Sequence, residues 1–215
     1  MKEQAVAISG APGKGFFQAL FLLFLMAVPA WAATGCDLNS PDRDVPRLFP
    51  ESTRYRSNYV SLRADQLRSV VARLGESFRV LYDPLNVRYT IYEIYNGSEK
   101  VGYIHGVNQK GQFGGIQVFV ALDLAGRIKS FYIQKMSGQW AGKFRDTEFG
   151  RRFLGISLKD FDSFDPVSGK GSGRLAKIRN PAPEMETDFY GVLRALKKNL
   201  ILMDELVYST KRQNP

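Results

Sequence analysis

The sequence has very little cysteine and histidine, with one residue of each among its 215. A lone cysteine excludes an intramolecular disulfide, so a hydrophobic core must hold the fold. The lone histidine, His105, has no second histidine or cysteine to share a metal ion, which excludes the common zinc ligand sets and a C-x-x-C-H haem attachment. It falls in a predicted strand, where we expect a structural residue and no catalytic triad. We therefore expect no bound metal.

An uncharged apolar run lies near the N-terminus, from Phe16 to Val28. Lys2 and Lys14 precede it, and small residues follow it up to Cys36. A basic start, a short apolar stretch and a small-residue exit are typical of an export signal, which we assign to residues 1–36. The run is shorter than the roughly 20 apolar residues of a membrane-spanning helix, so we expect cleavage, with an uncleaved signal helix as the alternative.

This signal ends in two alternative cleavage patterns. Residues 30–32, Ala-Trp-Ala, have the small-x-small pattern of ordinary signal peptidase, which releases a soluble protein. Residues 33–36, Ala-Thr-Gly-Cys, resemble a bacterial lipobox, which makes Cys36 the candidate lipidation site, although Ala33 stands where leucine is usual. Asp37 then resembles the signal that retains lipoproteins in the inner membrane. Either exit predicts a periplasmic protein or one anchored on the extracytoplasmic side of a membrane.

Acidic residues are outnumbered by basic ones, which gives a formal net charge of +9. In a cytosolic protein such an excess suggests nucleic acid as a partner. Export argues against nucleic acid and favours anionic lipid headgroups, an acidic redox partner or an anionic ligand.

A single domain is expected after the signal, because about 180 residues suffice for one hydrophobic core. The segment 37–60 starts with three prolines and alternating charges, which predicts a tether. The domain is assigned to residues 61–210, beginning with an amphipathic helix over Ser61 to Gly75. Strand-like stretches rich in β-branched and aromatic residues follow at 88–95, 101–107, 115–123 and 128–135.

The connections between these strands are short. Asn96-Gly97 and Ala125-Gly126 are hairpin signals that leave no room for crossover helices, which excludes a Rossmann fold and predicts an antiparallel meander of four or five strands.

Two helices are predicted in the second half of the chain. A short one over 147–154 turns Phe149, Phe153 and Leu154 inward. A long one places Arg194, Lys197 and Lys198 on a solvated face, opposite an apolar face formed by Phe189, Val192, Leu193, Leu196, Leu200 and Met203. The predicted fold class is therefore α+β: an antiparallel sheet meander packed against a long C-terminal helix and preceded by an export signal.

A family resemblance extends over about Tyr89 to Leu206. Its motifs are, in order, Gly102-Tyr103, the strand from Gly114 to Asp123, Gly126-Arg127-Ile128, the loop 137–144 and the segment 149–160. Their order and spacing resemble the FMN-binding domain of the C subunit of the sodium-pumping NADH:quinone oxidoreductase, the G subunit of the Rnf complex and the regulator of nitrous oxide reduction.

The chain departs from that family at its strongest motif, D-x-x-S/T-G-A-T, whose threonine receives FMN. Pro183 stands at the acceptor position and offers no hydroxyl. Glu184, Glu186 and Asp188 crowd the first turn of the last helix, where they would repel a phosphate dianion. The resemblance therefore implies a noncovalent flavin, its phosphate held by Lys143, Arg145 or the 170–174 loop.

Seven residues are the candidates for cofactor binding that this resemblance implies: Gly114, Gly115, Ser137, Gly138, Trp140, Lys143 and Asn180. Trp140 would provide a wall for the isoalloxazine ring. Each segment also has a plainer interpretation: Gly114-Gly115 as a strand start or bulge, 137–142 as a surface turn, and 168–173 as a flexible loop that lacks the P-loop order.

The function expected from these features is extracytoplasmic FMN binding in the service of a membrane redox complex or another electron-transfer protein, as a carrier rather than a substrate-converting enzyme. The alternative is a flavin-free structural or interaction module of a membrane assembly, built on the same fold.

Overall fold

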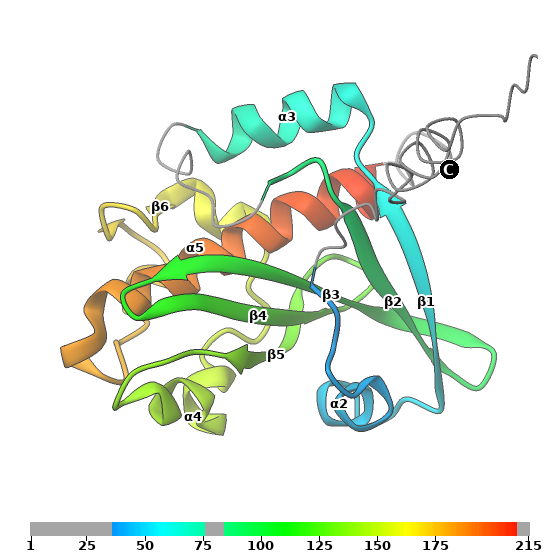
Figure 1. The fold of residues 1–215 in the computed structure, drawn as a ribbon, viewed down its shortest axis with the longest axis horizontal. Coiled ribbons are helices and arrows are strands. Elements are labelled where there is room, and N and C mark those ends of the chain that lie inside the picture. Colours follow the sequence, from blue (N-terminus) through cyan, green and yellow to red (C-terminus); the bar gives the residue numbers. More distant parts are fainter. Residues whose placement is uncertain (1–35, 76–83, 210–215) are drawn as a thin grey trace, which may run out of the picture. The chain divides into compact units, whose positions relative to one another are not determined.

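The computed structural model describes residues 36–75 and 84–209, so nearly all of the predicted export signal lies outside the described residues. The described chain forms a five-stranded antiparallel sheet with strands in the order β1-β2-β3-β4-β5 (Figure 1). The strands are β1 (Arg54–Ser61), β2 (Arg88–Asn96), β3 (Glu99–Gly111), β4 (Gly114–Leu122) and β5 (Ile128–Lys135). The main helices are α2 (Pro41–Leu48), α3 (Ala64–Leu74), α4 (Thr147–Arg151) and α5 (Glu186–Met203).

The predicted α+β class and antiparallel meander are confirmed. Neighbouring strands in the sequence are neighbours in the sheet throughout. Gly97 and Gly126 turn the chain between strands with φ of 59° and 77°, a backbone region that glycine adopts without steric cost. The sheet therefore uses the short connections that the sequence indicates.

The C-terminal helix α5 lies between the sheet and α3 (Figure 1). Its predicted apolar face is buried as expected, from Phe189 to Met203. The solvated face is predicted wrongly at Lys198, which is buried and donates from Nζ to the carbonyl oxygen of Asn108 on β3 at 3.0 Å. A helix covered on two sides has little free surface, and this lysine reaches a backbone acceptor instead of solvent.

The opposite face of the sheet carries a second, smaller core beneath α2. It contains Cys36, Leu38, Val45, Leu48, Phe49, Tyr92, Ile94, Ile104, Phe119 and Ala121. β1 adds to it as an edge strand paired with β2 from Arg54↔Tyr95 to Ser61↔Arg88. The predicted tether over 37–60 is therefore wrong: this segment holds a helix and a strand that belong to the domain.

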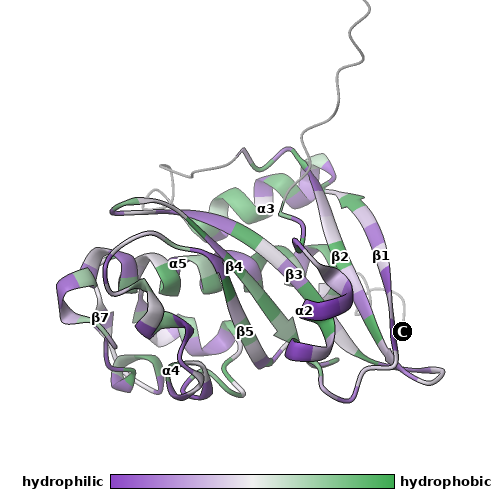
Figure 2. Cartoon of the chain, turned by 60° about the horizontal axis from the view of Figure 1, so that its bottom comes forward, coloured by the Kyte–Doolittle hydropathy of each residue, from purple (hydrophilic) through white to green (hydrophobic). Residues whose placement is uncertain are grey.

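The residues of α2 explain that error. Most of the helix is hydrophilic, as Figure 2 shows, and it contains Pro41 and Pro46. Only Val45, Leu48 and the following Phe49 supply the apolar side, at the i, i+3, i+4 spacing of one helical face. Three apolar residues among prolines and charges are too few to predict a helix from sequence.

Aromatic side chains join α4 to the edge strand β5. The ring centroids of Phe131 on β5 and Phe149 on α4 are 5.9 Å apart, and those of Phe131 and Phe153, just after α4, are 5.1 Å apart, both edge to face. Such pairs add about 0.5–1.5 kcal/mol beyond area burial. Phe149 and Phe153 point inward as predicted, whereas Leu154 is exposed.

No helix within 36–75 and 84–209 combines the length and apolar character needed to cross a membrane.

Candidate functional site

The predicted site residues centre on one end of the sheet, at the β3–β4 hairpin and the loop that follows β5. Gly111 and Gly114 pair across the hairpin, and Gln112 and Phe113 form its tip. Gly114 opens β4 with φ of 124° and Gly115 pairs with Lys110, so both glycines do serve as the start of a strand.

Gly138 brings this hairpin together with two distant segments. A Cβ atom on it would lie 2.6 Å from Cε of Met185 and 3.1 Å from Cδ2 of Phe113. Its φ of 124° also disfavours any other residue. The loop after β5, the hairpin tip and the turn before α5 therefore meet at a position where only glycine fits.

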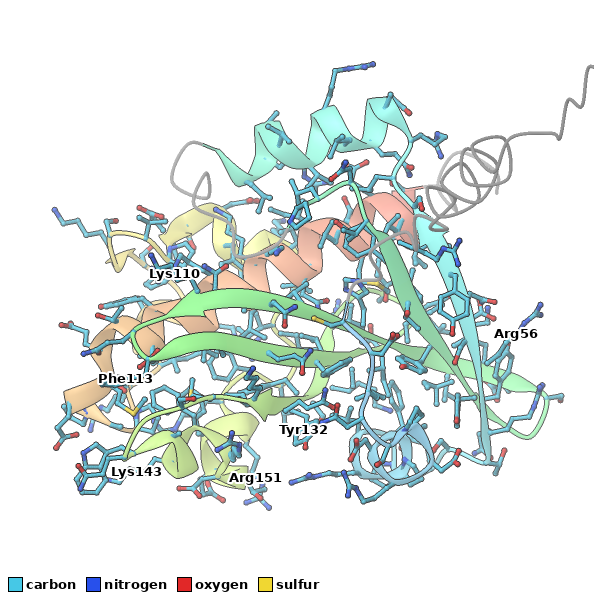
Figure 3. The ribbon with its side chains drawn as sticks, in the orientation of Figure 1. Arg56, Lys110, Phe113, Tyr132, Lys143 and Arg151 are labelled. Carbon is cyan, nitrogen blue, oxygen red and sulfur yellow. The ribbon has the colours of Figure 1, made fainter. Side chains whose placement is uncertain are left out.

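Two exposed aromatic rings mark this end of the molecule. Phe113 is 54% exposed and Trp140 is 37% exposed, far more than most large apolar side chains of the domain. The Nζ atom of Lys143 lies 4.9 Å from the Trp140 ring centroid, a cation–π contact worth about 0.5–1 kcal/mol at an exposed site. Figure 3 shows Phe113 and Lys143 at the same end of the sheet.

The remaining candidates have simpler roles. Ser137 is exposed at the start of the loop. Asn180 accepts a hydrogen bond on Oδ1 from the backbone N–H of Ala182 at 2.9 Å, a turn that leads into the short 3₁₀ helix Pro183–Met185 ahead of α5.

One acidic residue of α5, Asp188, contacts the β3–β4 hairpin. Asp188 is buried and accepts a hydrogen bond on Oδ1 from the N–H of Gln112 at 2.8 Å, which ties the hairpin tip to α5. Its Oδ2 atom is buried without a hydrogen-bond partner among the described residues. A carboxylate only accepts hydrogen bonds, so this end of α5 is unsuited to a phosphate.

The 168–173 segment, expected as a flexible loop, is partly ordered. Its Lys170–Gly171 strand (β7) pairs with Phe164–Asp165 (β6), and Asp165 accepts a hydrogen bond from the Ser168 hydroxyl at 2.6 Å. Arg174, a predicted phosphate ligand, donates to the carbonyl oxygens of Leu154 and Gly155.

A cavity of about 300 Å³ lies elsewhere, between α2, β5 and α4. Figure 3 shows two of its lining residues, Tyr132 and Arg151, in the region between α2 and α4. Arg145, the third candidate for the phosphate, lines this cavity, whereas none of the seven predicted cofactor residues does. Lys143 belongs to the same 3₁₀ helix as Arg145 but does not line the cavity, and its ammonium contacts the Trp140 ring instead.

Sequence reasoning missed Phe113 and Met185. Phe113 lies between the predicted strands 101–107 and 115–123, but its proximity to Gly138 depends on tertiary packing. Nothing in the sequence indicates that Arg47 and Lys129 line the same cavity, because they lie on elements that are far apart in the chain.

Among the described residues, no three histidine, cysteine, aspartate or glutamate side chains are grouped so that they could hold a metal ion. The absence of a metal remains a prediction. A comparison of the chain with protein-family models and with curated proteins finds no match.

Proposed function

We propose that this protein is an extracytoplasmic FMN-binding protein serving membrane-associated electron transfer, with the flavin held noncovalently. The observation that supports the proposal most is the pair of exposed rings, Phe113 and Trp140, beside the loop that contains Gly138. Planar apolar surface of this kind suits an isoalloxazine ring, which binds largely by stacking.

The residues present fit FMN in part. Trp140 and Phe113 offer stacking surface, and the Lys143 ammonium beside Trp140 offers a cation for the phosphate. Asp188 and the neighbouring glutamates disfavour a phosphate at the start of α5. The flavin would supply the electron-transfer chemistry, while the protein would bind the ring, orient it and set its environment.

The residues before α5 support noncovalent attachment. Pro183 is the first residue of the 3₁₀ helix and has no hydroxyl that could carry a phosphoester. All flavin should therefore leave the protein on denaturation, and a band that stays fluorescent in denaturing electrophoresis would contradict this.

A second candidate function is a flavin-free interaction module of a membrane assembly. The packing at Gly138 favours it, because Met185 and Phe113 already occupy the space that the missing side chain leaves. The exposed rings would then contact a protein partner instead of a cofactor.

FMN titration of the full-length protein, followed by flavin fluorescence quenching, separates the two functions. Under the flavoprotein proposal FMN binds, and Trp140→Ala weakens binding by about 1–3 kcal/mol, the range for loss of an aromatic stacking partner. Tyr59→Ala is the matched control, because Tyr59 is an exposed aromatic residue on β1, the opposite edge strand. Lack of quenching well above micromolar FMN rejects the flavoprotein and leaves the interaction module.

A further inference from the structure

The cavity of about 300 Å³ between α2, β5 and α4 has a chemistry distinct from that of the loop around Trp140. We propose that this cavity binds a phosphate group, carried either by a small soluble molecule or by an anionic lipid headgroup.

The cavity is lined by basic side chains from separate elements. Arg47 comes from the end of α2, Lys129 from β5, Arg145 from the 3₁₀ helix Ala141–Arg145, and Arg151 from α4. No acidic side chain is among the described residues that line it.

Two of the four cations have an acidic partner outside the lining. Lys129 pairs with Glu51, and Arg151 pairs with Glu148. Arg47 and Arg145 form no ion pair with a described residue, so the cavity keeps an excess of positive charge. An anion that enters it gains attraction from both guanidinium groups without breaking an existing pair.

Arg47 and Arg145 are also held in place before any ligand binds. The Cζ atom of Arg47 lies 4.5 Å from the ring centroid of Tyr132. Arg145 donates from Nε to the Ile133 carbonyl oxygen at 3.0 Å and from Nη2 to that of Met136 at 3.3 Å. A guanidinium has five N–H donors, so Arg145 keeps others for a ligand, and little side-chain freedom remains to be lost on binding.

The arrangement favours phosphate over carboxylate. A carboxylate is planar and is satisfied by one guanidinium, whereas the tetrahedral oxygens of a phosphate accept hydrogen bonds from several directions. The cations here converge from α2, β5 and α4, and the Thr147 hydroxyl is a further donor in the lining. Leu48 and Leu154 add apolar wall for the organic part of an ester.

The size of the cavity limits the ligand. About 300 Å³ is at the lower end of the range for small-molecule sites, which suits a phosphate with a short organic group. A phospholipid meets the same limit if only its headgroup enters.

Calorimetric titration of the full-length protein with inorganic phosphate tests whether the cavity binds a phosphate group, whichever molecule carries it. Arg47→Gln and Arg145→Gln should each weaken binding about tenfold, the loss expected for one charge-assisted hydrogen bond. Arg56→Gln removes the same charge from β1, at the opposite edge of the sheet (Figure 3), and should leave affinity unchanged. Arg47→Lys keeps the charge and should retain most of the binding.

A second arm identifies the source of the phosphate. Sedimentation with phosphatidylcholine vesicles, with and without phosphatidylglycerol, is compared between wild type and Arg47→Gln, so that the apolar N-terminal run is present in both. Loss of the phosphatidylglycerol-dependent fraction in Arg47→Gln assigns a lipid headgroup, whereas phosphate binding without such a difference assigns a soluble ligand.

The proposal is overturned if phosphate binding depends on neither Arg47 nor Arg145 and vesicle binding does not depend on Arg47. It is also overturned if Arg56→Gln weakens binding equally, since overall charge would then explain the result. Circular dichroism of each variant checks the fold. Trp140→Ala should leave phosphate binding unchanged, so this result is independent of whether FMN binds beside Trp140.

Discussion

His105 is a basic side chain placed in an apolar interface. It is 1% exposed, its backbone carbonyl accepts a hydrogen bond from Nδ2 of Asn199 on α5 at 2.8 Å, and its ring nitrogens have no hydrogen-bond partner among the described residues. Burial, with a smaller contribution from the Lys198 ammonium, lowers the pKa of His105 from 6.5 to about 4. The folded protein therefore keeps this ring neutral.

Stability should consequently fall on the acid side of neutrality. Above pH 6.5 the ring is neutral in both states and contributes no pH dependence. Between pH 6.5 and about 4 only the unfolded chain takes up the proton, so the free energy of unfolding decreases by up to about 1.4 kcal/mol per pH unit, on the order of 3 kcal/mol in all.

Urea denaturation at pH 7, 5.5 and 4 measures this decrease. His105→Leu has no proton to bind, so its loss of stability over the same range should be smaller by that amount, whatever its stability at pH 7. An identical pH dependence in both proteins would show that other groups cause it.

At the scale of elements, α2 is the part whose contribution is least evident from its composition. Phe49, directly after α2, is fully buried in the second core, whereas Phe113 at the hairpin tip is mostly exposed. Phe49→Ala should lower the free energy of unfolding by about 3–5 kcal/mol, as for other buried aromatic residues. Phe113→Ala, the same substitution at an exposed position, should cost less than about 1 kcal/mol.

Chemical denaturation of the two variants compares them directly. Equal and small losses would mean that residues 37–60 behave as the tether predicted from sequence and do not stabilise the domain.

The elements with strong periodicity could be predicted from sequence, and those with mixed signals could not. The strands around Ile91 and Val118 are rich in β-branched residues, and α5 has a continuous apolar face. β1 has no fully buried residue, and its few apolar residues, Tyr55, Tyr59 and Val60, do not alternate regularly with polar ones in the sequence.

The candidate site could likewise be predicted only in part. The Trp140–Lys143 contact could be expected, because the two residues share one loop. The meeting of Phe113, Gly138 and Met185 could not, since it depends on how the hairpin and the turn before α5 fold back on each other.

At the scale of the whole molecule, the burial of Cys36 links membrane anchoring to folding. The residue is 5% exposed and packs in the second core, where its Cβ lies close to Gly106. An acyl chain on Sγ cannot be accommodated in this packing, so a lipidated Cys36 would have to leave it.

Lipidation remains a prediction with a direct test. Cys36→Ser should abolish acyl labelling and move the domain from the membrane to the soluble fraction, while Ala33→Leu, which restores the usual lipobox residue, should increase labelling. Membrane association that survives Cys36→Ser would instead favour an uncleaved signal helix.

The central position of α5 has a consequence for folding during synthesis. The contacts from Lys198 to Asn108 and from Asn199 to His105 join residues 90 and 94 positions apart. A nascent chain that has not yet reached Glu186 contains all five strands of the sheet but lacks α5, which packs against its apolar face. Until the last helix is synthesised, that face is a surface for chaperones or for aggregation, and only the arrival of α5 ends this exposure.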